Sequence, residues 1–178
     1  CRVIITDISK ESLQKAEKQI LKKNDNYDLS IFKMNVCDKK SIQKCEEYFS
    51  KQNIFIDILI NNAAIDPKVS KENTIKNSSR FESFSIIEWE KQLNVGLTGA
   101  FQCSQIFGSK MAARNSGGVI LNIASDLSII APDQRIYKKK GLKDEQQPVK
   151  PVTYSVIKTG LVGLTKYIAT YWSEKNIR

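Results

Sequence analysis

The chain has 178 residues, with 28 Lys or Arg against 19 Asp or Glu, a formal net charge of +9. This length predicts one domain that buries roughly 70% of the surface of its unfolded chain, so folding needs neither a disulfide nor a metal. The sequence contains no histidine, which excludes Ser-His-Asp and Cys-His catalysis and the HExxH metal site. Its four cysteines form no CxxC pair, so we expect free thiols, no metal site and a reducing, cytoplasmic compartment.

The positive charge raises the possibility of nucleic-acid binding. The lysines are spread along the chain, however, and the one compact run, at 138–140, falls in an expected loop. No apolar run is long enough to span a membrane. We therefore expect a solvated lysine-rich surface, with neither nucleic acid nor membrane as a partner.

Strand and helix patterns alternate along the chain. Short apolar runs predict strands, and longer runs with apolar residues three or four apart predict helices. The expected strands cover 2–7, 29–36, 54–60 and 119–124. The expected helices cover 9–23, 38–50, 86–114 and 153–173, with long loops at 66–83 and 126–152. Strand-helix alternation predicts an α/β fold whose parallel strands have helices on both faces.

An acid follows the first expected strand. In a nucleotide-binding α/β fold, a carboxylate at the position of Asp7 accepts hydrogen bonds from an adenosine ribose and repels a 2′-phosphate. An acid before a helix is equally explained by the helix dipole. From Asp7 alone, the two interpretations stay open.

Tyr154 and Lys158 are four residues apart in the last expected helix, which places both side chains on one face. An ammonium group near a phenol favours the phenolate, and such a tyrosine can act as a general acid or base. Ser125 follows the fourth expected strand, where its hydroxyl could donate a hydrogen bond to a substrate oxygen. A surface Tyr-Lys pair and a capping serine are the alternatives for these residues.

Together these motifs resemble the classical short-chain dehydrogenase/reductase family. The resemblance covers essentially the whole chain and rests on order: Asp7, then Asn61-Asn62-Ala63-Ala64, then Ser125 and the Tyr154-x-x-x-Lys158 pair. It implies a Rossmann fold and hydride transfer between NAD, rather than NADP, and an alcohol or carbonyl substrate. The segment 125–134 is also similar to family members of bacterial surface-sugar and flagellin-modification pathways, which suggests a sugar derivative as substrate.

The resemblance also implies roles for individual residues. Tyr154 would be the general acid/base, Lys158 would assist it and bind the nicotinamide ribose, and Ser125 would polarise the substrate carbonyl. The cofactor-binding positions would be Asp7, Asn35, Val36, Asn62, Ala63 and Ala64, together with Tyr154 and Lys158. We also expect a homo-oligomer that packs through small residues of two helices, namely Gly99, Ala100, Cys103, Gly108, Gly160, Gly163 and Thr165.

The sequence departs from the family pattern at its ends and in the long helix. The Gly-rich turn of the family is absent, and so is its C-terminal substrate region, so we expect an internal fragment of a single NAD(P)-binding domain, residues 1–178. We expect a gap beside the first two strands, with exposed edges. Gly96 stands where the family has an asparagine that holds a water of a proton relay, and Asn94 would face elsewhere.

The loop between Ser125 and Tyr154 is longer than in the family, because these residues are 29 positions apart. The extra chain, 135–150, is either a tolerated surface insertion or a lid or anion contact at the substrate mouth. Two alternatives to an oxidoreductase remain. One is a dinucleotide-binding protein without turnover and the other an inactive truncated fragment.

Overall fold

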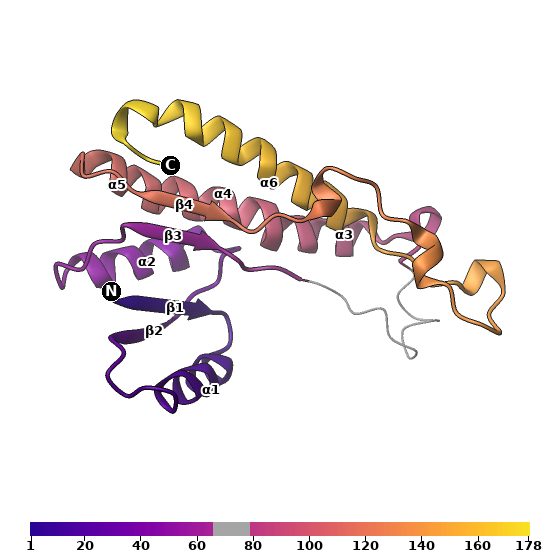
Figure 1. Ribbon diagram of the computed structural model, residues 1–178, viewed down its shortest axis with the longest axis horizontal. Helices are drawn as coiled ribbons and strands as arrows, with labels where there is room; N and C mark the ends of the chain where they lie inside the picture. The colour runs from indigo at the N-terminus through magenta and orange to yellow at the C-terminus, as the bar shows by residue number, and fades with distance from the viewer. Residues whose placement is uncertain (66–78) are drawn as a thin grey trace.

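The computed structural model describes residues 1–65 and 79–178 (Figure 1). Within these ranges the strands form two parallel pairs. β1 (Val3–Asp7) pairs with β2 (Leu29–Lys33), and β3 (Ile58–Asn61) pairs with β4 (Val119–Asn122). In the described ranges no strand joins the two pairs, so the expected gap is confirmed. The arrows of β1 and β3 point to the same side of the molecule in Figure 1.

Helices connect the strands as the sequence predicts. They are α1 (Lys10–Leu21), α2 (Lys39–Ser50), α6 (Val152–Tyr171) and a long helix over residues 86–114. The long helix consists of α3 (Ile86–Leu93), η3 (Asn94–Thr98), α4 (Gly99–Cys103), η4 (Ser104–Gly108) and α5 (Ser109–Arg114). The segments η3 and η4 are π-helical, a local widening that often marks functional sites. Figure 1 shows α6 running alongside the long helix.

Two of the predicted helix starts are confirmed by their caps. The hydroxyl of Ser9 accepts a hydrogen bond from the amide of Ser12 at 3.1 Å, and the Asp38 carboxylate accepts one from the amide of Lys40 at 2.9 Å. Each cap satisfies an amide that the first helical turn leaves without a partner. In both helices the sequence places a polar capping residue just before the apolar periodicity begins, and each helix begins at that residue, as predicted.

The strands are shorter than the sequence analysis expects. β2 ends at Lys33, because the side chain of Asn35 then accepts a hydrogen bond from the amide of Cys37 at 3.0 Å and turns the chain. β3 begins only at Ile58, where β4 becomes available to pair with it. Apolar residues before Ile58 pack against helices without joining the ladder.

The two strand pairs differ in how their faces are covered. α1 packs on one face of the β1–β2 pair, and α2 packs on its other face. Right-handed connections require this arrangement, because the connection from β1 to β2 and the connection from β2 to β3 run in opposite directions across the sheet. Helices cover only one face of the β3–β4 pair. Its other face exposes four apolar side chains, which are Ile58, Ile60, Val119 and Leu121. The expectation that the third strand is buried on both faces is therefore wrong for the described residues, although the Rossmann-like α/β fold is confirmed.

The helix α2 buries one charged side chain. Ile42, Cys45 and Phe49 are buried in one apolar cluster, whereas Tyr48 is exposed. Glu46 is also buried, and its carboxylate accepts a hydrogen bond from Ser50 and lies 3.5 Å from the ammonium of Lys110. These two partners explain how a carboxylate tolerates burial.

The small residues expected at an oligomer interface mostly lie inside the chain. A Cβ atom at Gly99 would meet Val36, and one at Gly160 would meet Leu97. Ala100 and Cys103 belong to the buried core, whereas Gly163 has open space around it. Gly99 and Gly160 therefore allow close approach of elements within one chain, and a homo-oligomer stays a prediction.

The two expected loops have different outcomes. Residues 66–78 of the first lie outside the described part of the chain. The second contains three single turns of 3-10 helix, η5 (Asp126–Ser128), η6 (Gln134–Tyr137) and η7 (Asp144–Gln146). Two further turns are η2 (Phe81–Ser83) and η8 (Ser173–Lys175). No helix of the described ranges is long and apolar enough to cross a membrane.

Candidate active site

The first two turns of α6 carry Tyr154 and Lys158. Pro151 precedes the helix, and its carbonyl accepts a hydrogen bond from the amide of Tyr154 at 3.2 Å. The hydroxyl of Thr153, which is fully buried, donates a hydrogen bond to the side-chain oxygen of Gln92 in α3. The start of α6 is therefore anchored to the long helix next to Tyr154.

Lys158 links α6 to the end of β4. Its ammonium group donates a hydrogen bond of 2.5 Å to the carbonyl oxygen of Ile123, and 9% of the residue is exposed. The same ammonium lies 5.7 Å from the centre of the Tyr154 ring. A buried ammonium group is costly without a partner, so the Ile123 carbonyl fixes the position of this charge beside Tyr154.

Ser125 follows β4 and caps η5. Its hydroxyl accepts a hydrogen bond from the amide of Leu127 at 3.2 Å and donates one to the carboxylate of Asp126 at 2.7 Å. The Asp126 carboxylate also accepts a hydrogen bond of 2.8 Å from the amide of Leu127. The hydrogen bonds from Ser125 and from Leu127 hold the pKa of the Asp126 carboxyl below its usual value. The capping interpretation of Ser125 is confirmed, and donation to a substrate requires its hydroxyl to turn away from Asp126.

The segment containing Ser125 is tied to the helix containing Tyr154 at two points. One is the hydrogen bond from Lys158 to Ile123, two residues before Ser125. The other is a hydrogen bond of 3.2 Å from the hydroxyl of Thr159 to the carbonyl oxygen of Ser128. η5 packs against α6 between these contacts, so the structure brings all three expected catalytic residues to one region.

Asp7 lies at the carboxyl end of β1 and is exposed. Its Oδ1 accepts a hydrogen bond from the amide of Ser9 at 2.7 Å, whereas its Oδ2 has no hydrogen bond to the described residues. An exposed carboxylate with an available oxygen can accept hydrogen bonds from a ribose. This part of the expected dinucleotide site fits the group.

Asn35 and Val36 follow β2, beside Asp7. The side chain of Asn35 accepts the hydrogen bond from Cys37 that forms the turn, and the backbone N–H of Asn35 donates a hydrogen bond to the hydroxyl oxygen of Ser41 at 2.9 Å. The side chain of Val36 packs against the long helix, and a Cβ atom at position 99 would lie only 2.9 Å from its Cγ2. Glycine is therefore the residue that fits at position 99. Both residues lie at the expected edge, and adenine contact by either remains a prediction.

Asn62, Ala63 and Ala64 directly follow β3 and are exposed at the same edge. The residue before them carries a contact that the sequence analysis missed. The side-chain amide of Asn61 donates hydrogen bonds to the oxygen of Asn122 at 2.8 Å and to the hydroxyl of Ser104 at 3.0 Å. Asn122 in turn donates to Thr165 of α6 at 2.9 Å, so this network joins both strands to both neighbouring helices. The sequence signal was an asparagine at the end of each of two apolar strands.

Gly96 is buried in η3, facing α6. A Cβ atom at this position would lie 2.8 Å from Cγ2 of Ile157. Asn94 is exposed, which confirms that it faces away from this site. No side chain from the long helix can therefore take the place of the family asparagine at position 96 without moving Ile157.

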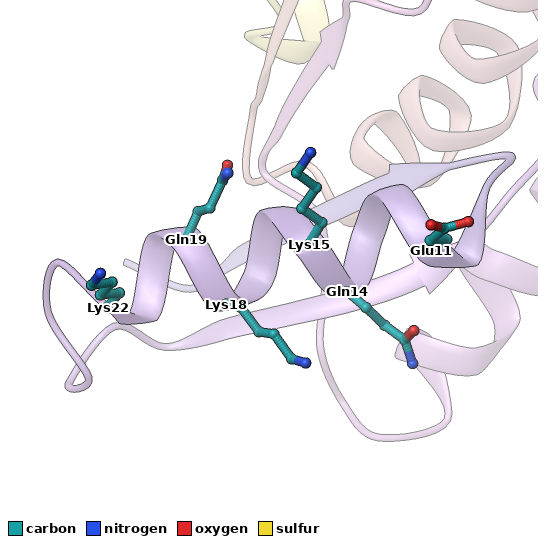
Figure 2. Close-up of a pocket in the computed structure, with 6 residues that line it drawn as sticks. All are labelled: Glu11, Gln14, Lys15, Lys18, Gln19 and Lys22. Carbon is teal, nitrogen blue, oxygen red and sulfur yellow. The ribbon is translucent and has the colours of Figure 1, made fainter.

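A hollow on the surface lies apart from these residues. It runs along α1 and is lined by side chains of that helix alone, which are Glu11, Gln14, Lys15, Lys18, Gln19 and Lys22. Figure 2 shows these side chains spreading away from α1 in different directions. A surface formed by one solvated helix face lacks the converging polar groups of a binding site.

Comparison with protein families decides which group the chain belongs to. A family model described as "Enoyl-(Acyl carrier protein) reductase" matches residues 1–178, the whole chain. The chain belongs to the short-chain dehydrogenase/reductase family. This confirms the family to which the sequence motifs point.

Individual relatives of this short-chain dehydrogenase/reductase are dehydrogenases. It is 29% identical over 175 residues to an NAD-dependent glycerol dehydrogenase of Listeria innocua, covering 98% of this chain and 56% of the relative. It is 27% identical over 147 residues to a D-threitol dehydrogenase of Mycolicibacterium smegmatis, covering 83% and 46%. The chain thus spans about half the length of these curated relatives.

A solved structure confirms the fold. The gluconate 5-dehydrogenase from Burkholderia cenocepacia J2315, solved in complex with NADP and tartrate, superposes with a TM-score of 0.76 at 21% sequence identity. The match covers 100% of this chain and 58% of that chain. At this identity the likeness shows the shared Rossmann-like fold.

Proposed function

We propose that the protein is an NAD-dependent oxidoreductase that interconverts an alcohol and a carbonyl group on a small polyol or sugar derivative. The observation that carries this proposal is the fixed geometry of Lys158. The carbonyl of Ile123, at the end of β4, holds the ammonium group of Lys158 beside the Tyr154 ring. Ile123 comes two residues before Ser125 in the sequence. The catalytic roles of Ser125, Tyr154 and Lys158, and a single domain over residues 1–178, are part of this proposal.

Each of the three residues has a distinct task in this mechanism. In the oxidation direction Tyr154, as phenolate, accepts the proton of the substrate hydroxyl. The Ser125 hydroxyl donates a hydrogen bond to the same oxygen as it becomes a carbonyl. A nicotinamide bound as NAD⁺ would accept the hydride that the carbinol carbon loses in this direction. The Lys158 ammonium stabilises the phenolate of Tyr154 electrostatically and binds the nicotinamide ribose.

The choice of NAD rests on Asp7. Its exposed carboxylate has an available oxygen for the ribose hydroxyls, and its charge repels a 2′-phosphate. The similarity to an NAD-dependent glycerol dehydrogenase supports the same choice. The similarity to a D-threitol dehydrogenase supports a polyol as substrate class.

Oxidation of polyols by the whole protein tests this function. We expect NAD⁺ to be reduced in the presence of at least one of glycerol, D-threitol, D-glucitol and D-gluconate. Ser125→Ala should lower kcat about 100- to 1000-fold, because one hydrogen bond to the developing charge is lost. Ser109→Ala, at an exposed serine of α5, serves as the matched control and should leave kcat unchanged. Wild-type activity in Ser125→Ala would contradict the proposed role.

A further inference from the structure

A buried hydrogen bond joins α6 to the long helix one residue before Tyr154. The hydroxyl of Thr153 donates to the side-chain oxygen of Gln92 in α3. Only 4% of Gln92 is exposed, and Thr153 is fully buried. Over residues 1–65 and 79–178, this is the only side-chain hydrogen bond that links the two helices directly. The mechanism above gives neither residue a role.

The rest of the interface between these helices is apolar. Ala100, Ile157 and Leu161 form a buried cluster, and Leu93 and Leu97 pack against it. An amide and a hydroxyl buried in such a place lose their hydration, and one hydrogen bond does little more than offset that loss. An apolar pair of the same size would hold the helices together as well. The polar pair therefore points to a requirement other than stability.

The amino end of α6 has no side-chain cap. The helix begins at Val152, and the residue before it is Pro151, whose side chain cannot accept a hydrogen bond from an amide of the first turn. Tyr154 is the third residue of the helix and therefore lies in this first turn. Helix ends open more easily than helix centres. The bond between Gln92 and Thr153 lies where it can keep this turn closed.

The position of Thr153 on α6 also determines where Tyr154 points. Thr153 and Ile157 are four residues apart, and both are buried against the long helix. Tyr154 and Lys158 each follow by one residue, so they share the neighbouring face, about 100° around the helix. The Ile123 carbonyl holds Lys158 independently. The Tyr154 hydroxyl has no hydrogen bond to the described residues, so the backbone of the first turn directs its phenol.

We propose that Gln92 is a positioning residue, which holds the first turn of α6 through Thr153 and so directs the phenol of Tyr154 toward the substrate oxygen. The proposal rests on the proposed function, in which Tyr154 exchanges a proton with the substrate. A hydrogen bond is directional and fixes the rotation of α6 about its axis, whereas apolar contacts tolerate a small rotation. Misplacement of a reacting group by about 1 Å can lower the rate about 100-fold.

A purely structural role for the pair makes a different prediction. If Gln92 and Thr153 only contributed to packing, a size-matched apolar pair would replace them without further effect. If removing the pair merely weakened the protein, all of α6 would open more often. The positioning role instead predicts that the first turn opens more often while the rest of α6 keeps its protection.

Hydrogen exchange on the whole protein separates these roles without turnover. Gln92→Met combined with Thr153→Val removes both polar groups and keeps their approximate size. We expect a urea midpoint at or above that of the wild type, because no buried polar group is left unpaired. Amides of residues 150–158, followed by mass spectrometry, should exchange at least about tenfold faster, and those of residues 162–171 less than twofold faster.

Two single variants keep the test decisive. Thr153→Ser retains the hydroxyl and should exchange within about twofold of the wild type. If the double variant does not fold, Gln92→Met alone replaces it, because the Thr153 hydroxyl can then bond to a backbone carbonyl of the preceding turn. Thr170→Val, at an exposed threonine near the other end of α6, is the matched control and should leave exchange of residues 150–158 unchanged.

Kinetics of the same variants test the consequence for Tyr154. For a polyol that the wild type oxidises, the double variant should lose about 10- to 100-fold in kcat, with KM and the NADH dissociation constant within twofold. Thr153→Ser should recover most of kcat. Unchanged exchange at residues 150–158, equal acceleration along α6, or faster exchange with wild-type kcat would overturn the proposal. A wild type that oxidises no polyol would instead count against the proposed function, and the exchange comparison would still decide whether Gln92 holds the turn.

Discussion

Ile157 of α6 fills the space beside Gly96 of the long helix. Its Cγ2 lies 2.8 Å from the position of a Cβ atom at residue 96, closer than side-chain carbons approach each other. The family asparagine at this position is therefore replaced by a close contact between two helices. Any water near Lys158 must be held by groups other than a residue 96 side chain.

Gly96→Ala tests this contact. Overpacking costs about 1–3 kcal/mol, and the gain in helix propensity returns about 1 kcal/mol, so we expect a net loss of about 1 kcal/mol in the free energy of unfolding. Urea denaturation measures this change. Gly163→Ala is the matched control in α6, because nothing lies within 4 Å of its Cβ position, and it should be neutral or stabilising.

The cause of the Gly96→Ala effect can be isolated with a double-mutant cycle. Ile157→Ala removes the methyl group that an alanine at position 96 would meet. Combined with Gly96→Ala, it should recover about 1 kcal/mol relative to the sum of the two single effects. Strict additivity would show that the helices already separate at this point.

Asp7 governs cofactor choice in our account. Asp7→Asn keeps an oxygen to accept the hydrogen bond from Ser9 but removes the negative charge. We expect the ratio of the NADPH to the NADH dissociation constant to fall at least tenfold, because repulsion of the 2′-phosphate is lost. Energy transfer from Trp89 and Trp172 to the bound cofactor measures both constants. Asp28→Asn, which breaks the exposed Arg2–Asp28 ion pair, should leave the ratio unchanged, and an unchanged ratio in Asp7→Asn would refute the assignment.

The cysteines differ sharply in environment. Burial raises the pKa of Cys45 and of Cys103 to about 12, whereas Cys1 and Cys37 are exposed. We expect two thiols of the folded protein to react with Ellman's reagent at pH 8, and all four after unfolding. If two thiols still reacted slowly with Ellman's reagent after unfolding in urea, burial in the folded state would not be the cause of their low reactivity.

The same burial predicts how stability depends on pH. Thiols of the unfolded chain ionise near pH 9, whereas Cys45 and Cys103 keep their protons in the folded state up to about pH 12. Between pH 9 and about pH 12 the folded state binds more protons than the unfolded state. The contribution of the two buried thiols to the free energy of unfolding is therefore complete below pH 9 and is lost as the pH rises toward 12. Urea midpoints at pH 8 and pH 10 should show this decline, and it should shrink in Cys45→Ala relative to Cys37→Ala.

Local sequence signals predicted most of the fold. Ser9 and Asp38 marked helix starts because a cap depends on residues within one turn. Strand ends were less predictable, since β3 is limited by where β4 pairs with it. The burial of Glu46 depends on Lys110, which lies far away in sequence.

The candidate site was predictable in its residue types but not in its contacts. Tyr154 and Lys158 share a helix face, so their proximity follows from spacing alone. Two contacts could not be predicted, namely the hydrogen bond from Lys158 to Ile123 and the position of Lys150 over the Tyr154 ring. Both depend on how the loop and β4 pack against α6, and the periodicity of the sequence carries no information on that packing.

The direct test of the central claim is a comparison of turnover and cofactor binding in Tyr154→Phe. This change removes one hydroxyl and keeps the ring that Lys150 and Lys158 flank. In the whole protein we expect polyol oxidation to fall by at least 1000-fold, because no phenolate remains to accept the proton, while NADH binds within about twofold of the wild type. Wild-type turnover with intact NADH binding would contradict the assignment of Tyr154 as the general acid/base.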